Sequence, residues 1–242
     1  MKAFMNWSGG KDSALAFYKA QQAGIPIDTL LTSVNAGTNR VSMHGVRREL
    51  LQLQATAIGL PLQTTELPEM PGMQAYETTV RNQNRRLKEA GFTHGIFGDL
   101  FLEDLKDYRE SLLAKDGLQC LYPLWKMDSH QIMQEFIEEG FKAIIVCVNS
   151  SLLDQQFCGR MLDKSFLNDL PSGVDACGEN GEYHSFVFDG PIFRQPISFL
   201  KGEIVFKEYK APVLQPDSAQ QDDCFTTPKQ EVGFFFQDLI AS

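Results

Sequence analysis

Six consecutive residues near the N-terminus combine the groups that bind a phosphate. They are Ser8, Gly9, Gly10, Lys11, Asp12 and Ser13. Glycines let the backbone approach an anion without a Cβ in the way. The lysine supplies a mobile cation, and the two serines supply hydroxyl donors. A tight strand-to-helix turn with a capping serine is the simpler alternative, but this concentration of residue types favours a phosphate-binding loop.

The segments on either side of this loop place it at a helix N-terminus. Residues 3–7 form a short apolar run that predicts a buried strand, and residues 14–20 continue at helical spacing. Backbone N–H groups converge at such a point, and the helix dipole adds about half a positive charge there. The spacing differs from that of the Walker A loop and from the Gly-x-Gly-x-x-Gly dinucleotide pattern.

A second group of reactive side chains occurs far along the chain. Asp175, Glu179, Glu182 and His184 lie within ten residues, around an Asn-Gly pair that predicts a hairpin turn. Carboxylates held this close need a cation, a shared proton or open water to relieve their repulsion. The turn could bind ammonium or magnesium, or supply a general base. An exposed acidic hairpin is the alternative.

The first half of the chain alternates strands and helices, which predicts an α/β fold with a Rossmann-like parallel sheet and flanking helices. Strands are expected at residues 3–7, 27–34, 61–67, 93–99 and 118–124, and helices at 14–20, 45–59, 75–90 and 103–115. Ligands of such sheets bind at the carboxyl ends of the strands. The phosphate loop, Asn35 and Asp99 all lie at these ends, where they are expected to line a nucleotide pocket.

The pattern changes near residue 125. A helix at 129–140, a strand at 142–149, a helical stretch at 151–170 and strands at 182–189, 197–200 and 203–209 predict a smaller α+β domain. We therefore divide the chain into residues 1–125, 126–210 and a C-terminal tail, 211–242, that is expected to be extended. Phe234, Phe235 and Phe236 must pack on the body or on a partner subunit, so a homodimer is possible.

Composition excludes several classes of function. The 242 residues include 22 Lys and Arg against 31 Asp and Glu, a net charge of −9, which argues against a nucleic-acid partner. A basic cluster at Arg81, Arg85, Arg86 and Lys88 is expected to be a solvated helix face. The five cysteines include no Cys-x-x-Cys pair, which predicts a reducing compartment and no zinc site.

Neither a signal-peptide pattern nor an apolar stretch of the ~20 residues that a membrane helix needs is visible in the sequence. We therefore expect a cytoplasmic protein without a membrane partner.

The hexapeptide resembles the signature of the PP-loop ATP pyrophosphatases. Three further motifs follow it in order: Gly98-Asp99, Pro123-Leu124-Trp125 and the run from Cys177 to Ser185. Together they resemble the diphthine–ammonia ligase family over roughly residues 1–209. The run at 99–109 is more similar to a bacterial-type branch than to eukaryotic members.

The resemblance implies a nucleotide domain followed by a small C-terminal domain, and amidation of a carboxylate with ATP and free ammonia, giving AMP and pyrophosphate. The carboxylate would be diphthine on elongation factor two or a small metabolite. RNA thiolation, for which Cys177 is the nearest cysteine, and a non-catalytic nucleotide sensor are the alternatives.

These considerations define a set of expected site residues. ATP is expected to contact Ser8, Gly9, Gly10, Lys11, Asp12, Ser13, Asn35, His44 and Asp99, with His44 near the adenine. Mg²⁺ is expected on Asp12 or Asp99. Catalysis is assigned to Lys11, Glu179, Glu182 and His184, the last three as candidates to take a proton from ammonium.

Overall fold

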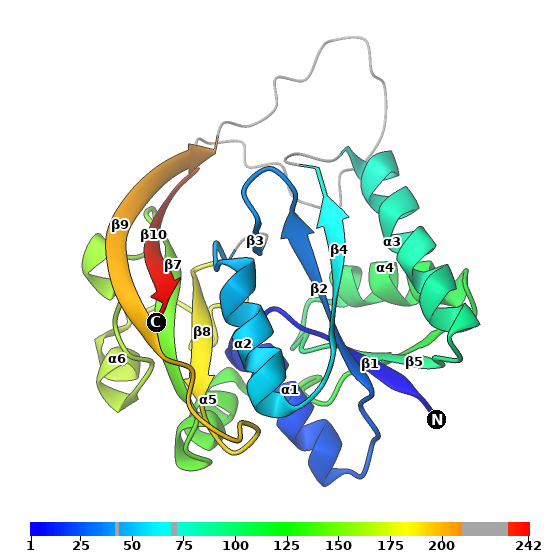
Figure 1. Ribbon diagram of the computed structural model, residues 1–242. Coiled ribbons are helices and arrows are strands. Elements are labelled where there is room, and N and C mark those ends of the chain that lie inside the picture. Colours follow the sequence, from blue (N-terminus) through cyan, green and yellow to red (C-terminus); the bar gives the residue numbers. More distant parts are fainter. Residues whose placement is uncertain (42–43, 69–71, 210–231) are drawn as a thin grey trace.

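The computed structural model describes residues 1–41, 44–68, 72–209 and 232–242, which form two β-sheets with helices around them (Figure 1). The first sheet contains β1 (Ala3–Asn6), β2 (Thr29–Asn35), β3 (Arg40–Val41), β4 (Leu62–Leu67), β5 (His94–Ile96) and β6 (Gln119–Leu121). The pairs β4–β2, β2–β1, β1–β5 and β5–β6 are parallel, and β3 pairs antiparallel with β2. The predicted parallel sheet is confirmed.

Helices cover both faces of this sheet. They are α1 (Lys11–Gln22), α2 (Arg48–Ile58), α3 (Met73–Glu89) and α4 (Glu103–Ala114). The chain runs outward from β1 to β2 and β4, and then crosses back to β5 on the other side of β1. Right-handed crossovers therefore place α1 and α2 on one face and α3 and α4 on the other (Figure 1). The order reverses between β1 and β5, which is where such sheets bind ligands.

The second sheet is antiparallel, with the order β8-β7-β10-β9. Its strands are β7 (Lys142–Asn149), β8 (Tyr183–Asp189), β9 (Phe199–Tyr209) and β10 (Val232–Ala241). The helix α5 (Ser129–Glu138) precedes β7, and the short helices η1 (Gln155–Phe157) and α6 (Lys164–Asp169) follow it. The two sheets lie on opposite sides of α1 and α2 (Figure 1). An α+β region after the nucleotide-type sheet is thus present, whereas the domain boundaries stay predictions.

The predicted helical stretch at 151–170 is wrong for most of its length. Only η1 and α6 are helical, and Asp154 and Asp163 each cap one of them. Between them the chain pairs with β7, since Gly159 N donates to Ile145 O at 2.8 Å. Gly159 has φ +80°, a left-handed conformation in which an α-helix cannot continue.

The C-terminal segment also differs from its prediction. Residues 232–241 form β10, which pairs with both β7 and β9, so this part of the expected tail is a central strand. The strands predicted at 197–200 and 203–209 are a single strand, β9. Phe235 packs against the core of the same chain, with its ring 5.0 Å from that of Phe206. Phe235 thus packs on the body of its own chain, one of the two outcomes expected for the phenylalanine run. Residues 210–231, with Cys224, lie outside the described part.

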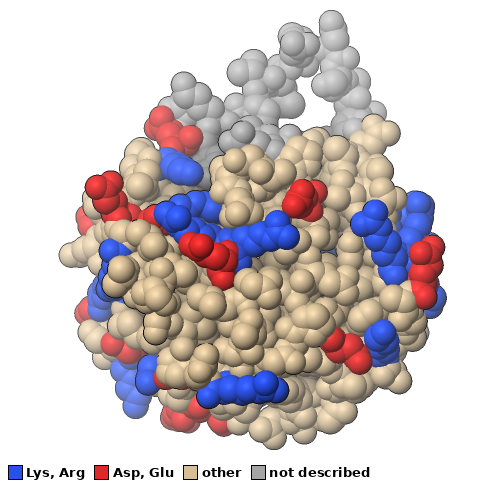
Figure 2. All heavy atoms as spheres, in the orientation of Figure 1, with Lys and Arg blue, Asp and Glu red and all other residues tan. Residues whose placement is uncertain are grey.

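The basic cluster on α3 is engaged locally. Arg81 and Arg85 both contact the carboxylate of Asp116, and Lys88 Nζ donates to the carbonyl of Gly117 at 2.7 Å. Figure 2 shows both signs of charge in small groups separated by wide uncharged areas, so this face has no extended basic surface. None of the helices in the described ranges combines the length and apolar composition needed to cross a membrane.

The second sheet packs directly on the phosphate loop. Val187 N on β8 donates to Gly9 O at 2.9 Å. Gln54 on α2 joins three segments, because its Oε1 accepts from Trp7 Nε1 at 2.9 Å and its Nε2 donates to Gly9 O and Val187 O. Gln54 is fully buried. One continuous apolar core extends from the first sheet into the second.

Replacing Gln54 with Ala is expected to lower the free energy of unfolding by about 1–3 kcal/mol, because buried polar groups of Trp7, Gly9 and Val187 lose a partner. Urea denaturation measures the change. Gln52→Ala is the matched control, since Gln52 is an exposed residue of the same helix. Equal stability of the two variants would contradict the bridging role.

Candidate functional site

The phosphate loop joins the end of β1 to the start of α1 in a geometry that requires its glycines. Gly9 has φ +79°, and Gly10 is the N-cap of α1. A Cβ on Gly9 would lie 2.7 Å from Gln54 Oε1, and one on Gly10 would lie 2.9 Å from His44 Cε1. The side chains of Gln54 and His44 therefore pack closely against the backbone of the two glycines. Its strand, turn and helix order is the one that the sequence predicts.

Serine hydroxyls form hydrogen bonds with some of the backbone groups of the loop. Ser8 Oγ accepts from Gly10 N at 3.3 Å and donates to Ser13 Oγ at 3.2 Å, and Ser13 Oγ donates to Gly10 O at 2.9 Å. The first amide of the helix, Lys11 N, donates to Ser185 Oγ on β8 at 3.1 Å. A serine hydroxyl that accepts one bond can still donate its own proton, so Ser185 could donate to an anion at this position.

Lys11 is a buried cation held by a neighbouring carboxylate. Its Nζ lies 2.9 Å from Asp12 Oδ2 and 5.1 Å from the centre of the Tyr183 ring. Burial by itself lowers the pKa of Lys11, but Asp12 and the other acidic groups around it outweigh burial, and the net pKa is raised. The ammonium group therefore stays charged near neutral pH, as a phosphate-binding group requires.

Two further carboxylates lie close to Asp12. Glu179 Oε1 accepts from the backbone N of Leu100 at 3.1 Å, and burial together with repulsion from Asp12 raises the pKa of Glu179 to about 8. Burial also raises the pKa of Asp99, although Arg109 Nε lies 3.1 Å from its Oδ2. Like charges held together in a partly dry place favour one shared proton or a cation.

The carboxylates of Asp175 and Glu182 accept hydrogen bonds from groups of their own loop. Glu182 is buried, and its two oxygens accept from Asp175 N, Asn180 N and Asn180 Nδ2 at 2.9–3.1 Å. Asp175 Oδ1 accepts from the backbone N of Cys177 and of Glu179. These contacts fix the loop that presents Glu179. Of the carboxylates that crowd this turn, Glu179 is the one that faces Lys11 and Asp12.

The two histidines of the expected site stack on each other beside the loop. The rings of His44 and His184 are 4.5 Å apart at 30°, and His44 Nδ1 lies 3.3 Å from Ser185 O. Burial lowers the pKa of His44 to about 4 and that of His184 well below its ordinary value. Both rings are neutral near pH 7. His184 Nε2 has no hydrogen-bond partner within the described segments.

Asn35 and Cys177 have other roles in the structure. Asn35 Oδ1 accepts from Gly37 N and Thr38 N, which closes the turn between β2 and β3. The Cys177 thiol is buried and donates to Ser129 O at 3.4 Å, and burial raises its pKa. A thiol of this kind is a poor nucleophile, because only the thiolate attacks.

Asp12 and Asp99 are the candidate carboxylate ligands of a magnesium ion. Over the described ranges, no three His, Cys, Asp or Glu side chains are grouped as a metal site. Mg²⁺ on a nucleotide usually takes one or two carboxylates and completes its shell with phosphates and water. Asp12 Oδ1 is buried without a hydrogen bond from the rest of the described structure, whereas Asp99 Oδ2 is paired with Arg109 Nε at 3.1 Å. Asp12 therefore offers an open oxygen to a phosphate-bound ion, and Asp99 could join it only by giving up its contact with Arg109.

Sequence reasoning missed Ser185 and Gln54 as residues of the site. Ser185 belongs to the motif at 177–185, so its presence near the loop had a signal, but its bond to Lys11 N did not. Gln54 carries no motif at all. Both act across long separations, 174 residues from Ser185 to Lys11 and 133 from Gln54 to Val187.

Comparison with known proteins gives a consistent result over nearly the whole chain. A family model described as the diphthamide synthase N-terminal domain matches residues 1–120, and one described as the diphthamide synthase C-terminal domain matches residues 128–214. The chain is 29% identical over 234 residues to a diphthine–ammonia ligase of Bos taurus, with 82% of each chain covered.

It is also similar to proteins of the same name from two other vertebrates. The identity is 28% over 221 residues for the Homo sapiens protein, with 82% of each chain covered. For the Danio rerio protein it is 28% over 211 residues, covering 78% of this chain and 83% of the relative.

Glu179→Gln is expected to stabilise the fold relative to the parent in a pH-dependent way. Below the ordinary pKa of 4.5 the carboxyl is protonated in both folded and unfolded chains. Between 4.5 and about 8 the folded chain holds a proton that the unfolded chain releases, so the parent loses stability as pH rises. Urea midpoints of the two proteins at pH 5, 7 and 8.5 measure this. A difference that does not change with pH would contradict the raised pKa.

Proposed function

The chain belongs to the diphthamide synthase family and is an ATP-dependent ligase, and we propose that it joins ammonia to a carboxylate through an acyl-adenylate. The observation that carries the proposal is the position of Glu179, a carboxyl with a raised pKa, beside the Lys11–Asp12 pair of the phosphate loop. A proton acceptor and a loop suited to bind pyrophosphate thus lie in the same site, where one reaction could use both.

In the first step, an oxygen of the acceptor carboxylate attacks the α-phosphorus of ATP. The bond from that phosphorus to the bridging oxygen breaks, and pyrophosphate leaves. Lys11, the hydroxyl of Ser185 and the positive end of the α1 dipole stabilise the charge that develops on the leaving group. Asp12 and Asp99 would hold Mg²⁺, which neutralises phosphate charge when bound.

In the second step, ammonium gives a proton to Glu179, and the resulting ammonia attacks the acyl carbon. The acyl–oxygen bond then breaks, AMP leaves, and the nitrogen gives its extra proton to solvent as the amide forms. A general base works best when its pKa lies near the working pH, which favours Glu179. His184 is the weaker candidate because its lowered pKa makes the imidazole a poor base. Glu182 supports the step through the loop that it holds.

The acceptor that the relatives' name suggests is diphthine, and a small metabolite carboxylate is the second candidate. RNA thiolation is disfavoured because the Cys177 thiol is buried with a raised pKa. Incubating the protein with ATP and ammonium, and with either diphthine-bearing elongation factor two or a panel of small acids, distinguishes the acceptors by AMP release. ATP that stays intact with every acceptor would support a nucleotide sensor instead.

Lys11→Ala is expected to reduce AMP formation by a factor of at least about 10² because the leaving pyrophosphate loses its cation. Chromatography of AMP under saturating ATP measures the change. Lys19→Ala is the matched control on the same helix, since Lys19 pairs with Glu135 on α5. An unchanged AMP yield in Lys11→Ala would refute the phosphate role.

Glu179→Gln is expected to slow amide formation by about 10²–10⁴-fold with ammonium as the nitrogen source. Hydroxylamine is neutral at pH 7 and needs no prior deprotonation, so it should restore product formation in the variant. In the parent, the rate at a fixed concentration of ammonium should rise with pH through about 8 as Glu179 loses its proton. Equal losses with both nucleophiles would contradict the base assignment.

A further inference from the structure

The C-terminal strand β10 contacts a short segment that also contacts the phosphate loop. This segment, residues 44–47, leads into α2. His44 lies against the loop, since a Cβ on Gly10 would lie 2.9 Å from its Cε1. Gly45 lies against β10, because a Cβ there would lie 2.7 Å from Cδ1 of Phe236. The segment therefore lies between the phosphate loop and the last strand of the chain.

Two arginines beside this segment converge on one carboxylate of β10. Asp238 Oδ1 lies 2.8 Å from Nη2 of Arg40. Arg47 donates to both oxygens of Asp238, from Nε at 3.1 Å and from Nη2 at 2.6 Å. Two parallel bonds of this kind fix the position of a guanidinium group more tightly than one bond. We call Arg40, Arg47 and Asp238 the carboxylate clamp.

The carboxylate clamp supports both glycines of the phosphate loop. Arg47 is the N-cap of α2, the helix that carries Gln54, and Gln54 Nε2 donates to Gly9 O at 3.0 Å. Arg40 acts on the other side, because its Nη1 donates at 2.7 Å to the carbonyl of the residue that follows His44. The two side chains that pack on the loop glycines are thus both tied to the clamp.

The charge of Asp238 keeps the two arginines together. The hydrogen bond from Arg47 holds the pKa of Asp238 below its ordinary value, so the carboxylate is ionised near pH 7. Two guanidinium groups without that carboxylate would repel each other across a short distance. Removing the charge should therefore displace the segment that carries His44, even when the size of the side chain is kept.

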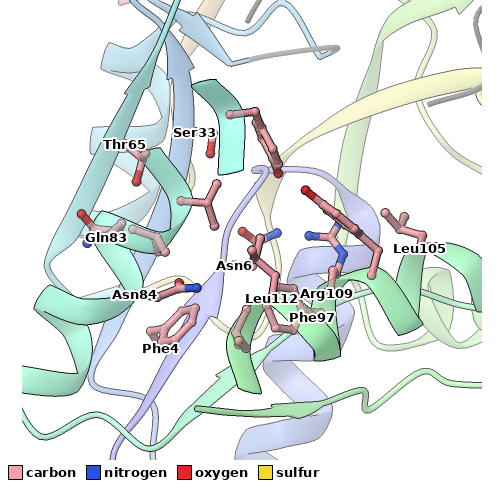
Figure 3. A pocket seen from close by; sticks show the side chains of 15 residues that line it. Phe4, Asn6, Ser33, Thr65, Gln83, Asn84, Phe97, Leu105, Arg109 and Leu112 are labelled. Atoms are coloured by element: carbon pink, nitrogen blue, oxygen red, sulfur yellow. The ribbon is translucent and has the colours of Figure 1, made fainter. Parts of the chain in front are cut away.

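The clamp is separate from the cavity beside the loop. That cavity, of about 170 Å³, lies between the first sheet and the helices α3 and α4, where Asn6, Asn84 and Arg109 converge (Figure 3). No member of the clamp contributes to the lining that the structure describes. Any effect of the clamp on a ligand in this region must therefore pass through the phosphate loop.

We propose that Asp238 is a positioning residue of the phosphate loop. Through its two arginines it keeps His44 and Gln54 against the loop glycines. A loop held in its binding conformation loses less entropy when an anion arrives. The proposal rests on the proposed function for the role of this loop in binding pyrophosphate. It adds a residue from β10, a strand that begins at residue 232, whereas the C-terminal family model matches only to residue 214.

The variant Asp238→Asn removes the charge and keeps the size of the side chain. In the unliganded protein, the NMR signals of the His44 ring and of the Gly10 amide should both move. The physical reason is that the His44 ring leaves its stack with His184, 4.5 Å away, and its contact with Gly10. Asp238→Glu keeps the charge and should return both signals toward their parental positions. Signals that stay in place in Asp238→Asn would overturn the proposal.

Asp189→Asn is the matched control. Asp189 pairs with Lys142 at 2.8 Å within the same sheet, and its side chain is 23% exposed against 20% for Asp238. This variant loses an ion pair of similar exposure that does not involve the segment at 44–47. The His44 and Gly10 signals should keep their parental positions in it, and equal shifts in both variants would contradict a specific role of Asp238.

Calorimetric titration with inorganic pyrophosphate measures the consequence for binding. Affinity should fall about three- to tenfold in Asp238→Asn, which corresponds to the cost of ordering one side chain on binding. Asp238→Glu should recover most of the loss. Shifted NMR signals with unchanged affinity would overturn the positioning role. A parent that binds no pyrophosphate would contradict the proposed function, while the NMR signals would still decide whether the clamp positions the loop.

Arg47→Lys tests the clamp even when Asp238→Asn fails to fold. Lysine keeps the positive charge but lacks the planar fork that makes two bonds to one carboxylate. The His44 and Gly10 signals should therefore move in this variant as well. Parental signal positions in Arg47→Lys would overturn the proposal.

Discussion

The attachment of the second sheet to the phosphate loop is the constraint on which the rest of the site depends. A glycine-rich loop without side-chain contacts would sample many conformations, because glycine loses more backbone entropy on ordering than other residues. Here Gln54 and the backbone of Val187 hold Gly9, and Ser185 holds the first amide of α1. The loop is therefore ordered before a nucleotide arrives, which lowers the entropic cost of binding.

The same attachment produces the electrostatics of the site. Because β8 lies against α1, the loop that precedes β8 brings Glu179 close to Lys11 and Asp12. One cation and several carboxylates then share a partly dry space, and the pKa values of Lys11 and Glu179 are both raised. Lys11 stays charged while Glu179 holds its proton to a higher pH. Under the proposed function, Lys11 would thus bind the anion and its neighbour Glu179 would transfer the proton.

The sequence correctly predicted those elements that a few adjacent residues determine. The strand, glycine turn and helix around Lys11 were predictable because each is set by a few adjacent residues, and the parallel sheet followed from the alternation of elements. The prediction of a helix at 151–170 was wrong because the backbone of this segment forms hydrogen bonds to β7 instead. The strand at 232–241 was missed because the polar residues before it suggested a tail. The pairing of Glu182 with its own loop and the contacts of Asp238 with two arginines depend on tertiary geometry that no spacing encodes.

The position of β10 in the middle of the second sheet has a consequence for biosynthesis. Residues 232–241 form the strand between β7 and β9. The second sheet therefore cannot be completed until these last residues have been synthesised. The parallel sheet, in contrast, is complete by residue 121 and can collapse during translation. The phosphate loop needs β8 as its support, so it can mature only after residue 189 has been synthesised, well after the first sheet.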